Sequence, residues 1–241
     1  MKSLIIVTPV WNENLEPHEL LRISITITNN VDIPHVFIGP NDKKFLKILK
    51  MFPKSTLVSL PASHFVSVSS YSKMLMDPKF YELFNEFEFL LICQLDAILI
   101  KNAKLLTTFG YDYIGSVWEK GYSILKIRKH LIVNHQVNRI LKSDVIFVGN
   151  GGLSLRRTES MFWLTSKIEA FNSQLKEKFP EDVLISYFGE KVGLRIPAYL
   201  EAEEIFREKT AIGLTEIPEI YGFHALAKYN PNLENKLFNV S

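Results

Sequence analysis

The sequence has a single cysteine, Cys93, among its 241 residues. One thiol can form neither an internal disulfide bond nor a cysteine-rich zinc site, so a disulfide-stabilised scaffold is excluded. Long hydrophobic runs are also absent, because no stretch reaches the roughly 18 apolar residues that a membrane-spanning helix needs. The opening MKSLIIVTPVW has neither the length nor the cleavage site of a secretory signal. We therefore expect a cytoplasmic location.

An excess of charge of one sign is absent as well, since the formal net charge is only +2. So small an excess does not favour nucleic-acid binding. The middle of the chain nevertheless gathers basic residues, namely Lys120, Lys126, Arg128, Lys129, His130, Arg139 and Lys142. They are either an ordinary solvated surface or a patch that attracts an anionic substrate or the inner face of a membrane. Peripheral membrane association therefore stays open.

Hydrophobic residues make up 47% of the chain, which is enough to bury a core, and the length favours one domain. Three apolar runs are rich in β-branched residues and are stopped by proline, which is typical of strands, namely SLIIVTPV, HVFIGP and STLVSLP. The segments between them, EPHELLRISITITNN and DKKFLKILKMFP, have helical spacing. This order predicts an α/β fold with a doubly wound, mostly parallel sheet flanked by helices.

The rest of the chain continues this alternation. SSYSKMLMDPKFYELFNEF predicts two helices that Asp77 and Pro78 separate, and FLLICQLDAILI predicts a fourth strand. Further strands are predicted for YDYIGSVW and for Val145 to Val148, and residues 119–145 between them are polar and irregular, as loops are. ESMFWLTSKIEAFNSQLKEKF and EDVLISYFGEKVG predict two more helices.

The fourth predicted strand carries two polar residues, Gln94 and Asp96, where a buried strand would have apolar ones. A carboxylate buried in mid-strand would cost several kcal/mol unless it were paired. Asp96 is therefore expected at the end of its strand, where ligands of parallel sheets bind and where a carboxylate can hold a divalent cation. The alternative is an aspartate that caps the next turn.

The segment Gly149-Asn150-Gly151-Gly152 places three glycines in four positions. Glycine allows the backbone to approach a ligand closely or to adopt a positive φ. The segment follows an apolar strand but does not open a clear helix, so it matches neither the dinucleotide fingerprint nor the phosphate-binding P-loop. A ligand-binding backbone and a hairpin turn are both open.

Glu181 and Asp182 follow Pro180 at the start of a predicted helix. Acids in a first helical turn are ordinary partners of the helix dipole. In a cleft, a carboxylate can instead act as a general base that takes the proton from an acceptor hydroxyl.

His224 lies in the segment YGFHA near the end of the chain. A lone histidine is often structural. Beside a glycine, it could also fold back as a ligand of a metal or a phosphate.

Five segments in this order resemble the DUF5672 family of bacterial glycosyltransferase-like proteins. They are FLLICQLDAIL, YDYIGSVW, VGNGGLSLRR, EDVLIS and YGFHA. In that family a strand ending in QLDA precedes a YDYIGAPW-type segment, a GNGGFSLR block, an EDVF segment and a GFHA ending. The resemblance covers about residues 60–227. It implies a single GT-A domain over residues 1–241, with a nucleotide-sugar-binding half over about 1–110 and an acceptor and catalytic half over about 111–241.

The resemblance also implies roles for particular residues. Asp182 and Glu181 would be catalytic, with Asp182 favoured as the base. The donor would contact Thr8, Pro9, Val10, Gln94, Asp96, Gly151, Gly152 and Arg156. Asp96 and His224 match positions that hold Mn²⁺ or Mg²⁺ in GT-A enzymes. Gln94 stands where the Asp-X-Asp motif of such enzymes has its first acid, so dependence on a metal stays open.

The activity implied is that of a glycosyltransferase. It would move a sugar, such as galactofuranose, from a UDP-sugar to a hydroxyl of a glycan or lipid-linked glycan, with inversion, during synthesis of a bacterial surface polysaccharide of the O-antigen kind. Two alternatives remain. The single acid of QLDA favours a nucleotide-sugar- or carbohydrate-binding module without catalysis, and a nucleotidyltransferase would share the fold but release pyrophosphate.

Overall fold

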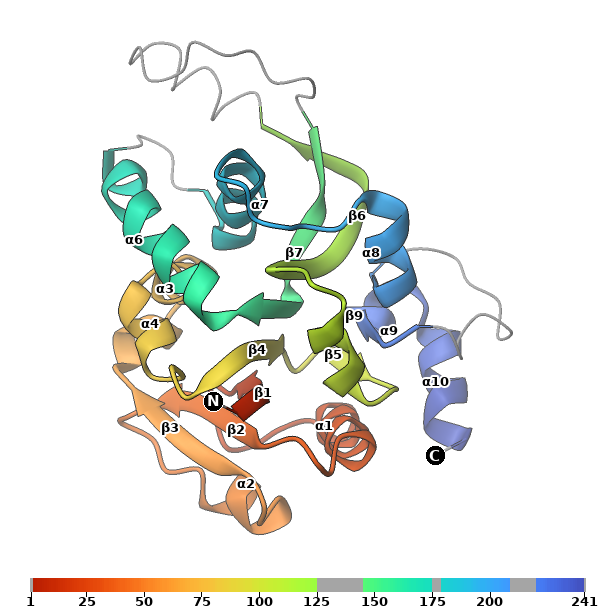
Figure 1. Cartoon of the computed structure of the whole chain (residues 1–241). Coiled ribbons are helices and arrows are strands. Elements are labelled where there is room, and N and C mark those ends of the chain that lie inside the picture. The colour runs from red at the N-terminus through yellow and green to blue at the C-terminus, as the bar shows by residue number, and fades with distance from the viewer. Residues whose placement is uncertain (1, 125–144, 175–178, 209–219, 241) are drawn as a thin grey trace.

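The computed structural model describes residues 2–124, 145–174, 179–208 and 220–240. A six-stranded sheet with the strand order β3-β2-β1-β4-β7-β6 lies at its centre (Figure 1). Its strands are β1 (Lys2–Pro9), β2 (His35–Pro40), β3 (Thr56–Leu60), β4 (Phe87–Cys93), β6 (Tyr113–Ser123) and β7 (Val145–Arg157). The first four pair in parallel, and β7 runs antiparallel to both β4 and β6. The predicted α/β fold with a mostly parallel sheet flanked by helices is confirmed.

Helices cover both faces of this sheet (Figure 1). One face is covered by α3 (Val68–Leu75), α4 (Pro78–Glu82), α6 (Thr158–Gln174) and α7 (Glu181–Lys191), whose apolar side chains share one core cluster with β1, β2 and β4. The other face is covered by α1 (Pro17–Asn29) and α2 (Leu46–Met51). The short elements η1 (Ala62–Phe65), η2 (Ala103–Thr108), α8 (Tyr199–Ile205), α9 (Leu226–Tyr229) and α10 (Pro231–Val240) complete the described helices.

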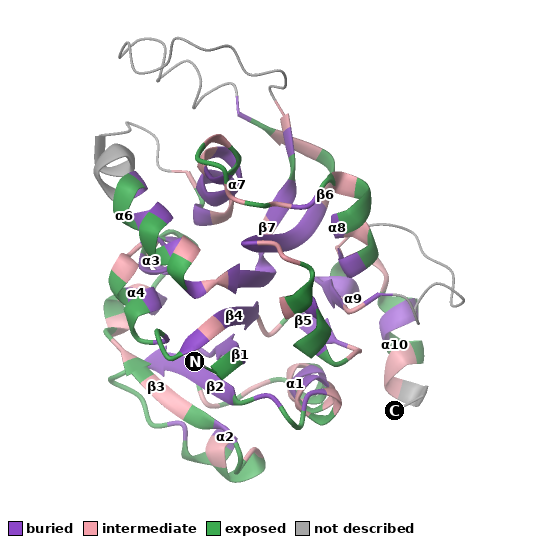
Figure 2. Cartoon of the chain, viewed as in Figure 1, coloured by how far each residue is buried: buried purple, intermediate pink, exposed green. Residues whose placement is uncertain are grey.

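From Phe89 to Cys93, strand β4 is buried on both sides, which explains the apolar run in that part of the strand. Leu90 and Ile92 pack into the cluster under α3 and α6, whereas Leu91 and Cys93 pack into the cluster of the opposite face. Figure 2 shows the central strands as the most buried part of the molecule. Burial raises the pKa of the Cys93 thiol to about 12, so this cysteine is a structural side chain.

The segment FLLICQLDAILI forms two strands, so the prediction of one strand was wrong. After β4 the chain turns at residues 94–96 and continues as β5 (Ala97–Leu99). This strand belongs to a second sheet of order β5-β9-β8, with β8 (Phe206–Arg207) and β9 (Gly222–His224). The polar pair Gln94 and Asp96 marks the turn between the two sheets, because a polar side chain costs least where the chain leaves the buried sheet.

The glycine run 149–152 lies inside β7 and is not a hairpin turn. The ladder between β6 and β7 is irregular beside it, with register shifts around Ser116 and Val117. Residues 119–123 of the irregular loop predicted for 119–145 belong to β6, which continues to Ser123, and Val145 begins β7. Most of the predicted basic patch, residues 126–142, lies outside the described residues.

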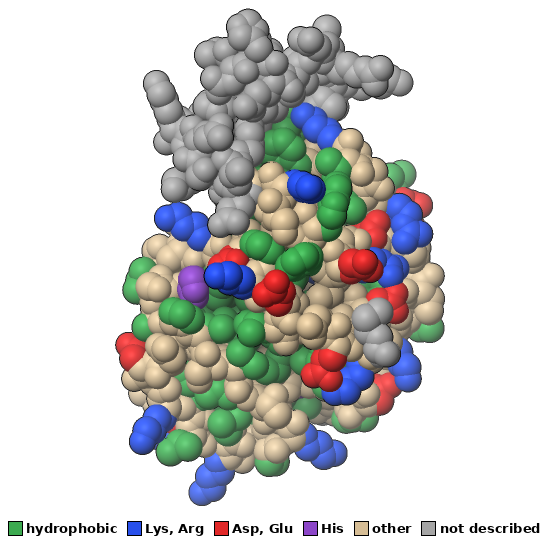
Figure 3. Space-filling model, turned by 60° about the vertical axis from the view of Figure 1, so that its left-hand side comes forward, with side chains coloured by type: hydrophobic (Ala, Val, Ile, Leu, Met, Phe, Trp, Pro, Cys, Tyr) green, Lys and Arg blue, Asp and Glu red, His purple; other side chains and the backbone are tan. Residues whose placement is uncertain are grey.

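Charged side chains of both signs lie among hydrophobic and polar ones on the face seen in Figure 3. The basic side chains described there form no continuous surface. Within the described residues, no helix is long and apolar enough to cross a membrane.

The close packing of β9 against β5 predicts that a methyl group at Gly222 lowers the stability of the fold. A Cβ at Gly222 would lie 2.6 Å from the carbonyl oxygen of Ile98, a backbone atom of the paired strand β5. We expect Gly222→Ala to lower the free energy of unfolding by about 1–3 kcal/mol, measured by urea denaturation. Gly189→Ala in α7 is the control, since its Cβ would meet only side-chain atoms of Ile196 and Leu194 and alanine favours the helix. Equal losses in the two variants would contradict this account of the second sheet.

Candidate functional site

The candidate site lies where β4 ends beside Gly152, the last residue of the glycine run in β7. The Gln94 N–H donates to the carbonyl oxygen of Gly152 over 2.9 Å, which ties the turn after β4 to β7. A side chain at Gly152 would collide with the His224 ring and with Gln94. Only glycine therefore allows these three residues to meet. The carboxylate of Asp96 stands beside them and is 52% exposed.

Asp96 and His224 are joined through the second sheet. Ala97 pairs with His224 across β5 and β9, and the Ala225 N–H donates to the carbonyl oxygen of Asp96 over 2.9 Å. Ala225 adopts the left-handed conformation (φ 52°), which ends β9 directly after the histidine. The register therefore places His224 Nε2 3.4 Å from Asp96 Oδ1.

His224 lies between two carboxylates. Its Nδ1 is 3.5 Å from Glu208 Oε1, on the side opposite Asp96, and both ring nitrogens are buried without a well-formed hydrogen bond. Burial lowers the pKa of His224, but the two carboxylates together offset this effect and raise the pKa to about 9. Burial raises the pKa of Asp96, but His224, a backbone hydrogen bond and the charge of Arg22 together outweigh burial and lower the pKa. The pair therefore favours opposite charges.

The same residues can be tested as a metal site. Within the described residues, no group of three or more His, Cys, Asp or Glu side chains is arranged to hold a metal ion. His224 Nε2 is nevertheless a buried nitrogen without a hydrogen-bond partner, close to the carboxylate of Asp96. Imidazole nitrogen and carboxylate oxygen suit Mn²⁺, and oxygen alone suits Mg²⁺. The two residues fit a cation that takes its remaining ligands from a phosphate and water.

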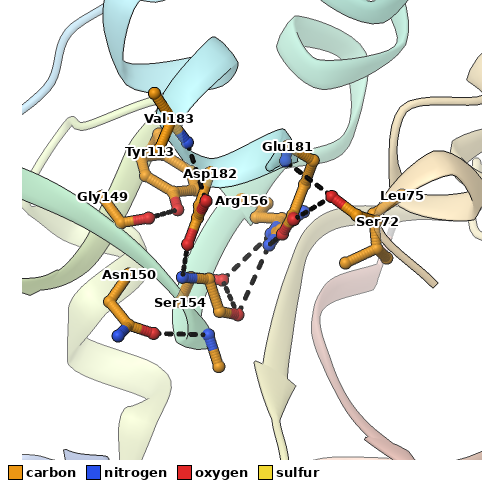
Figure 4. Close-up of polar contacts among 12 residues, drawn as sticks. Ser72, Leu75, Tyr113, Gly149, Asn150, Ser154, Arg156, Glu181, Asp182 and Val183 are labelled. Atoms are coloured by element: carbon orange, nitrogen blue, oxygen red, sulfur yellow. Dashed lines mark hydrogen bonds and ion pairs between the residues drawn. The ribbon is translucent and has the colours of Figure 1, made fainter. Parts of the chain in front are cut away.

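Asp182 faces the glycine run from the other side (Figure 4). Its Oδ2 accepts the N–H of Gly151 over 3.2 Å, and its Oδ1 accepts the N–H of Val183 over 2.8 Å. Burial raises the pKa of Asp182 to about 7, and the negative charge of Glu181 acts in the same direction. A carboxyl with such a pKa can exchange a proton near neutral pH.

Glu181 is held in the interior by two partners (Figure 4). Its Oε1 lies 3.0 Å from Arg156 Nη2, and its Oε2 accepts the Ser72 hydroxyl over 3.0 Å. The Ser72 oxygen in turn accepts the Glu181 N–H over 2.7 Å and so caps the first turn of α7. These contacts join α7 to α3 and β7, and they leave Glu181 with both oxygens engaged.

Arg156 is completely buried in the strand β7. Its Nε donates to Ser154 Oγ and its Nη1 to Tyr81 Oη, each over 3.0 Å. The guanidinium carbon also lies 5.6 Å from the ring centroid of Tyr113. Arg156, predicted to contact the donor, thus lies beneath the site and supports it from below.

The predicted contacts at the end of β1 are also in the interior. Thr8 Oγ1 lies 3.0 Å from His35 Nε2, and Val10 is fully buried in the cluster under α1. Pro9, between them, is buried as well. The neighbouring Trp11 is partly exposed and stacks on the Tyr71 ring, with 6.1 Å between the ring centroids. At this edge of β1, Trp11 is thus more accessible than the three predicted residues.

Sequence reasoning missed Glu208, Ser72 and Tyr71. Ser72 and Tyr71 lie in α3, where helical spacing marked them only as part of an amphipathic helix. Glu208 follows the two-residue strand β8, which is too short to recognise in a sequence. These residues are recognised only from their contacts with residues far away in the sequence. The structure brings together Gln94, Asp96, Gly151, Gly152, Asp182 and His224, and it places Thr8, Val10 and Arg156 in the core.

Comparison with known proteins adds a family and a fold. A family model described as "Protein of unknown function (DUF5672)" matches residues 54–224. This range includes every residue that the structure brings together at the site, and it excludes β1. No curated protein sequence gives a significant match to the chain.

Two similar solved structures are of the galactosyltransferase LgtC. One, in complex with donor and acceptor sugar analogs, has a TM-score of 0.57 and 11% identity, and the match covers 98% of this chain and 95% of that one. The other is an active-site mutant, with a TM-score of 0.54, 12% identity, and coverage of 91% and 86%. At such identity the likeness shows a shared fold, that of a GT-A glycosyltransferase.

The buried ion pair predicts a large and recoverable loss of stability. Arg156→Met leaves the carboxylate of Glu181 in the interior without its cation, which should cost about 3–5 kcal/mol of unfolding free energy. Adding Glu181→Gln removes the unpaired charge and should recover part of that loss. A double-mutant cycle by urea denaturation measures the coupling, and strictly additive effects would contradict a direct pair.

The raised pKa of Asp182 predicts a pH-dependent stability. An unfolded aspartate has a pKa of about 4, and the folded value is about 7. The destabilisation from ionising Asp182 is therefore absent at low pH, grows as the pH rises above the unfolded value, and is complete above the folded value.

We expect Asp182→Asn to gain about 2 kcal/mol of stability relative to the wild type between pH 5 and pH 8. Chemical denaturation at both values measures this change. Asp42→Asn, in the exposed turn between β2 and α2, is the control and should gain no comparable amount. A constant difference between Asp182→Asn and wild type across this range would rule out the raised pKa.

Proposed function

The chain belongs to the DUF5672 family of proteins of unknown function, and we propose that this member is a glycosyltransferase that uses a nucleotide sugar. Its fold is that of LgtC, a galactosyltransferase solved with donor and acceptor sugar analogs. The main support for this proposal is the position of Gly151 and Gly152 between Asp182 and His224. Gly151 binds the carboxylate of Asp182, and Gly152 lies against Gln94 and His224. Two consecutive glycines thus join a proton-exchanging acid to a candidate phosphate-binding pair.

The donor would lie over the end of β4 with its diphosphate at Asp96 and His224. The imidazolium of His224 stabilises the negative charge of a phosphate. A divalent cation would be held by Asp96 and by the neutral form of His224, in place of the Nε2 proton, and would supply positive charge that neutralises the leaving diphosphate. Gln94 has no charge of its own and serves as a hydrogen-bonding partner at the same turn.

Asp182 is the proposed general base, and Glu181 is not, because both oxygens of Glu181 are engaged by Arg156 and Ser72. The Asp182 carboxylate takes the proton of an acceptor hydroxyl as that oxygen attacks the anomeric carbon of the donor. The bond between this carbon and the phosphate oxygen breaks, and the nucleoside diphosphate leaves with the electron pair. Attack opposite the leaving group inverts the anomeric configuration.

The proposed donor, sugar and acceptor follow from the resemblance of the sequence to its family. We propose a UDP-sugar donor, with galactofuranose as the first sugar to test, and a hydroxyl of a glycan or lipid-linked glycan as the acceptor. The donor would be held by about residues 1–110 and the acceptor by about 111–241 of one domain. This assignment places the protein in the synthesis of a bacterial surface polysaccharide, in the cytoplasm or at the inner face of the membrane.

One observation favours a second candidate, a nucleotide-sugar-binding module without catalysis. Gln94 leaves the turn after β4 with a single carboxylate. The two candidates differ in turnover, since a module binds UDP but releases none from UDP-sugars.

Substitution of the base tests the catalytic proposal. Asp182→Asn should lower the rate of UDP release from a panel of UDP-sugars with glycan acceptors by at least about 100-fold. Its affinity for UDP should stay within about threefold of wild type, since the substitution keeps one acceptor for the Gly151 N–H. In the wild type kcat/KM should rise with pH through about 7, because only ionised Asp182 accepts a proton. A near wild-type rate in Asp182→Asn would refute the base assignment, and the absence of turnover despite UDP binding in the wild type would favour the module.

A further inference from the structure

Glu208 is the one close partner of the second nitrogen of the His224 ring among the described residues. The side chains of both residues are nearly enclosed, with 12% of Glu208 and 11% of His224 exposed. Oε1 of Glu208 lies 3.5 Å from Nδ1, whereas Nε2 faces Asp96 on the opposite side of the ring. A buried carboxylate beside a buried imidazole is costly unless the two interact.

The position of Glu208 follows from strand register. In the parallel pair of β8 and β9, Phe206 pairs with Gly222 and Arg207 with Phe223. Glu208 directly follows the last residue of β8, and His224 is the last residue of β9. The Tyr221 N–H also donates to the carbonyl oxygen of Ile205 over 3.0 Å, which continues the pairing on the other side. The contact is therefore built into the second sheet.

The two nitrogens of an imidazole are not equivalent, and the partner of one decides the state of the other. A carboxylate at Nδ1 favours a proton there, and this leaves the lone pair of the neutral ring on Nε2. Histidine ligands of metals are commonly held in this way, by a carboxylate that fixes the ring and raises its basicity. In this chain Nε2 faces Asp96, Gln94 and Gly152.

We propose that Glu208 is a positioning residue of the donor site, which holds Nδ1–H of His224 and so directs Nε2 toward Asp96 and a cation bound between them. This inference rests on the proposed function for the identity of the site. It adds a residue that contacts neither donor nor cation and acts only through His224.

The test is a calorimetric titration of the full chain with Mn²⁺, with and without UDP. Glu208→Ala should weaken Mn²⁺ binding by about 10–100-fold, and His224→Ala by at least as much. Glu208→Gln should lose less than Glu208→Ala, since its amide oxygen can still accept Nδ1–H. Glu204→Gln, an exposed residue of the preceding helix α8, is the matched control and should bind Mn²⁺ as the wild type does.

Thermal unfolding and UDP binding without metal are measured on the same samples. A Glu208→Ala variant with a lower Tm and an unchanged Mn²⁺ affinity would show a merely structural role and overturn the inference. A wild type that binds no Mn²⁺ under either condition would also overturn it. Failure of the proposed function gives a different result, because a wild type without UDP affinity would refute the donor site while the titration with Mn²⁺ alone still tests Glu208.

Discussion

The candidate site depends on one interaction, the buried ion pair between Arg156 and Glu181. Arg156 has no exposed surface, and a charge in such a place is tolerated only with a partner and further hydrogen bonds. Glu181, Ser154 and Tyr81 supply them. The pair fixes the first turn of α7 over β7. Asp182, the next residue, is thereby brought to the backbone of Gly151.

The buried ion pair fixes the position of α7 but adds little to the free energy of unfolding. A buried ion pair adds little net stability compared with well-packed apolar residues, but breaking it is costly, so the start of α7 has few alternative positions. Asp182 adds a cost of its own, because burial and the charge of Glu181 both disfavour its ionised form. The folded chain thus holds the proposed base, Asp182, at a position that disfavours its negative charge. Acids and bases with pKa values near the working pH are obtained in this way.

Much of the fold could be predicted from local pattern. The apolar runs gave the parallel strands, the Asp77-Pro78 break separated α3 from α4, and the acidic pair opened α7 as expected. Asp96 was expected at the end of a strand because a buried carboxylate is costly, and it lies in the turn after β4. Glu208, which lies beside the other ring nitrogen of His224, could not be found in this way, because only the pairing of β8 with β9 brings it to the histidine. Thr8 and Arg156 show the converse. Both were predicted to contact the donor, yet both form hydrogen bonds with other polar side chains in the core. Only the three-dimensional contacts distinguish a ligand-binding residue from a residue that pairs in the core.

The most direct measurement is a crystal structure of the protein with UDP and Mn²⁺. The account predicts UDP at the end of β4, with its diphosphate at Asp96 and His224 and with Asp182 facing the place of the donor sugar across Gly151 and Gly152. A second position is available at the other end of β4, where a cavity of about 390 Å³ lies between α4 and the start of α6. UDP in that cavity, or UDP at the end of β4 with its phosphates turned away from Asp96 and His224, would contradict the account.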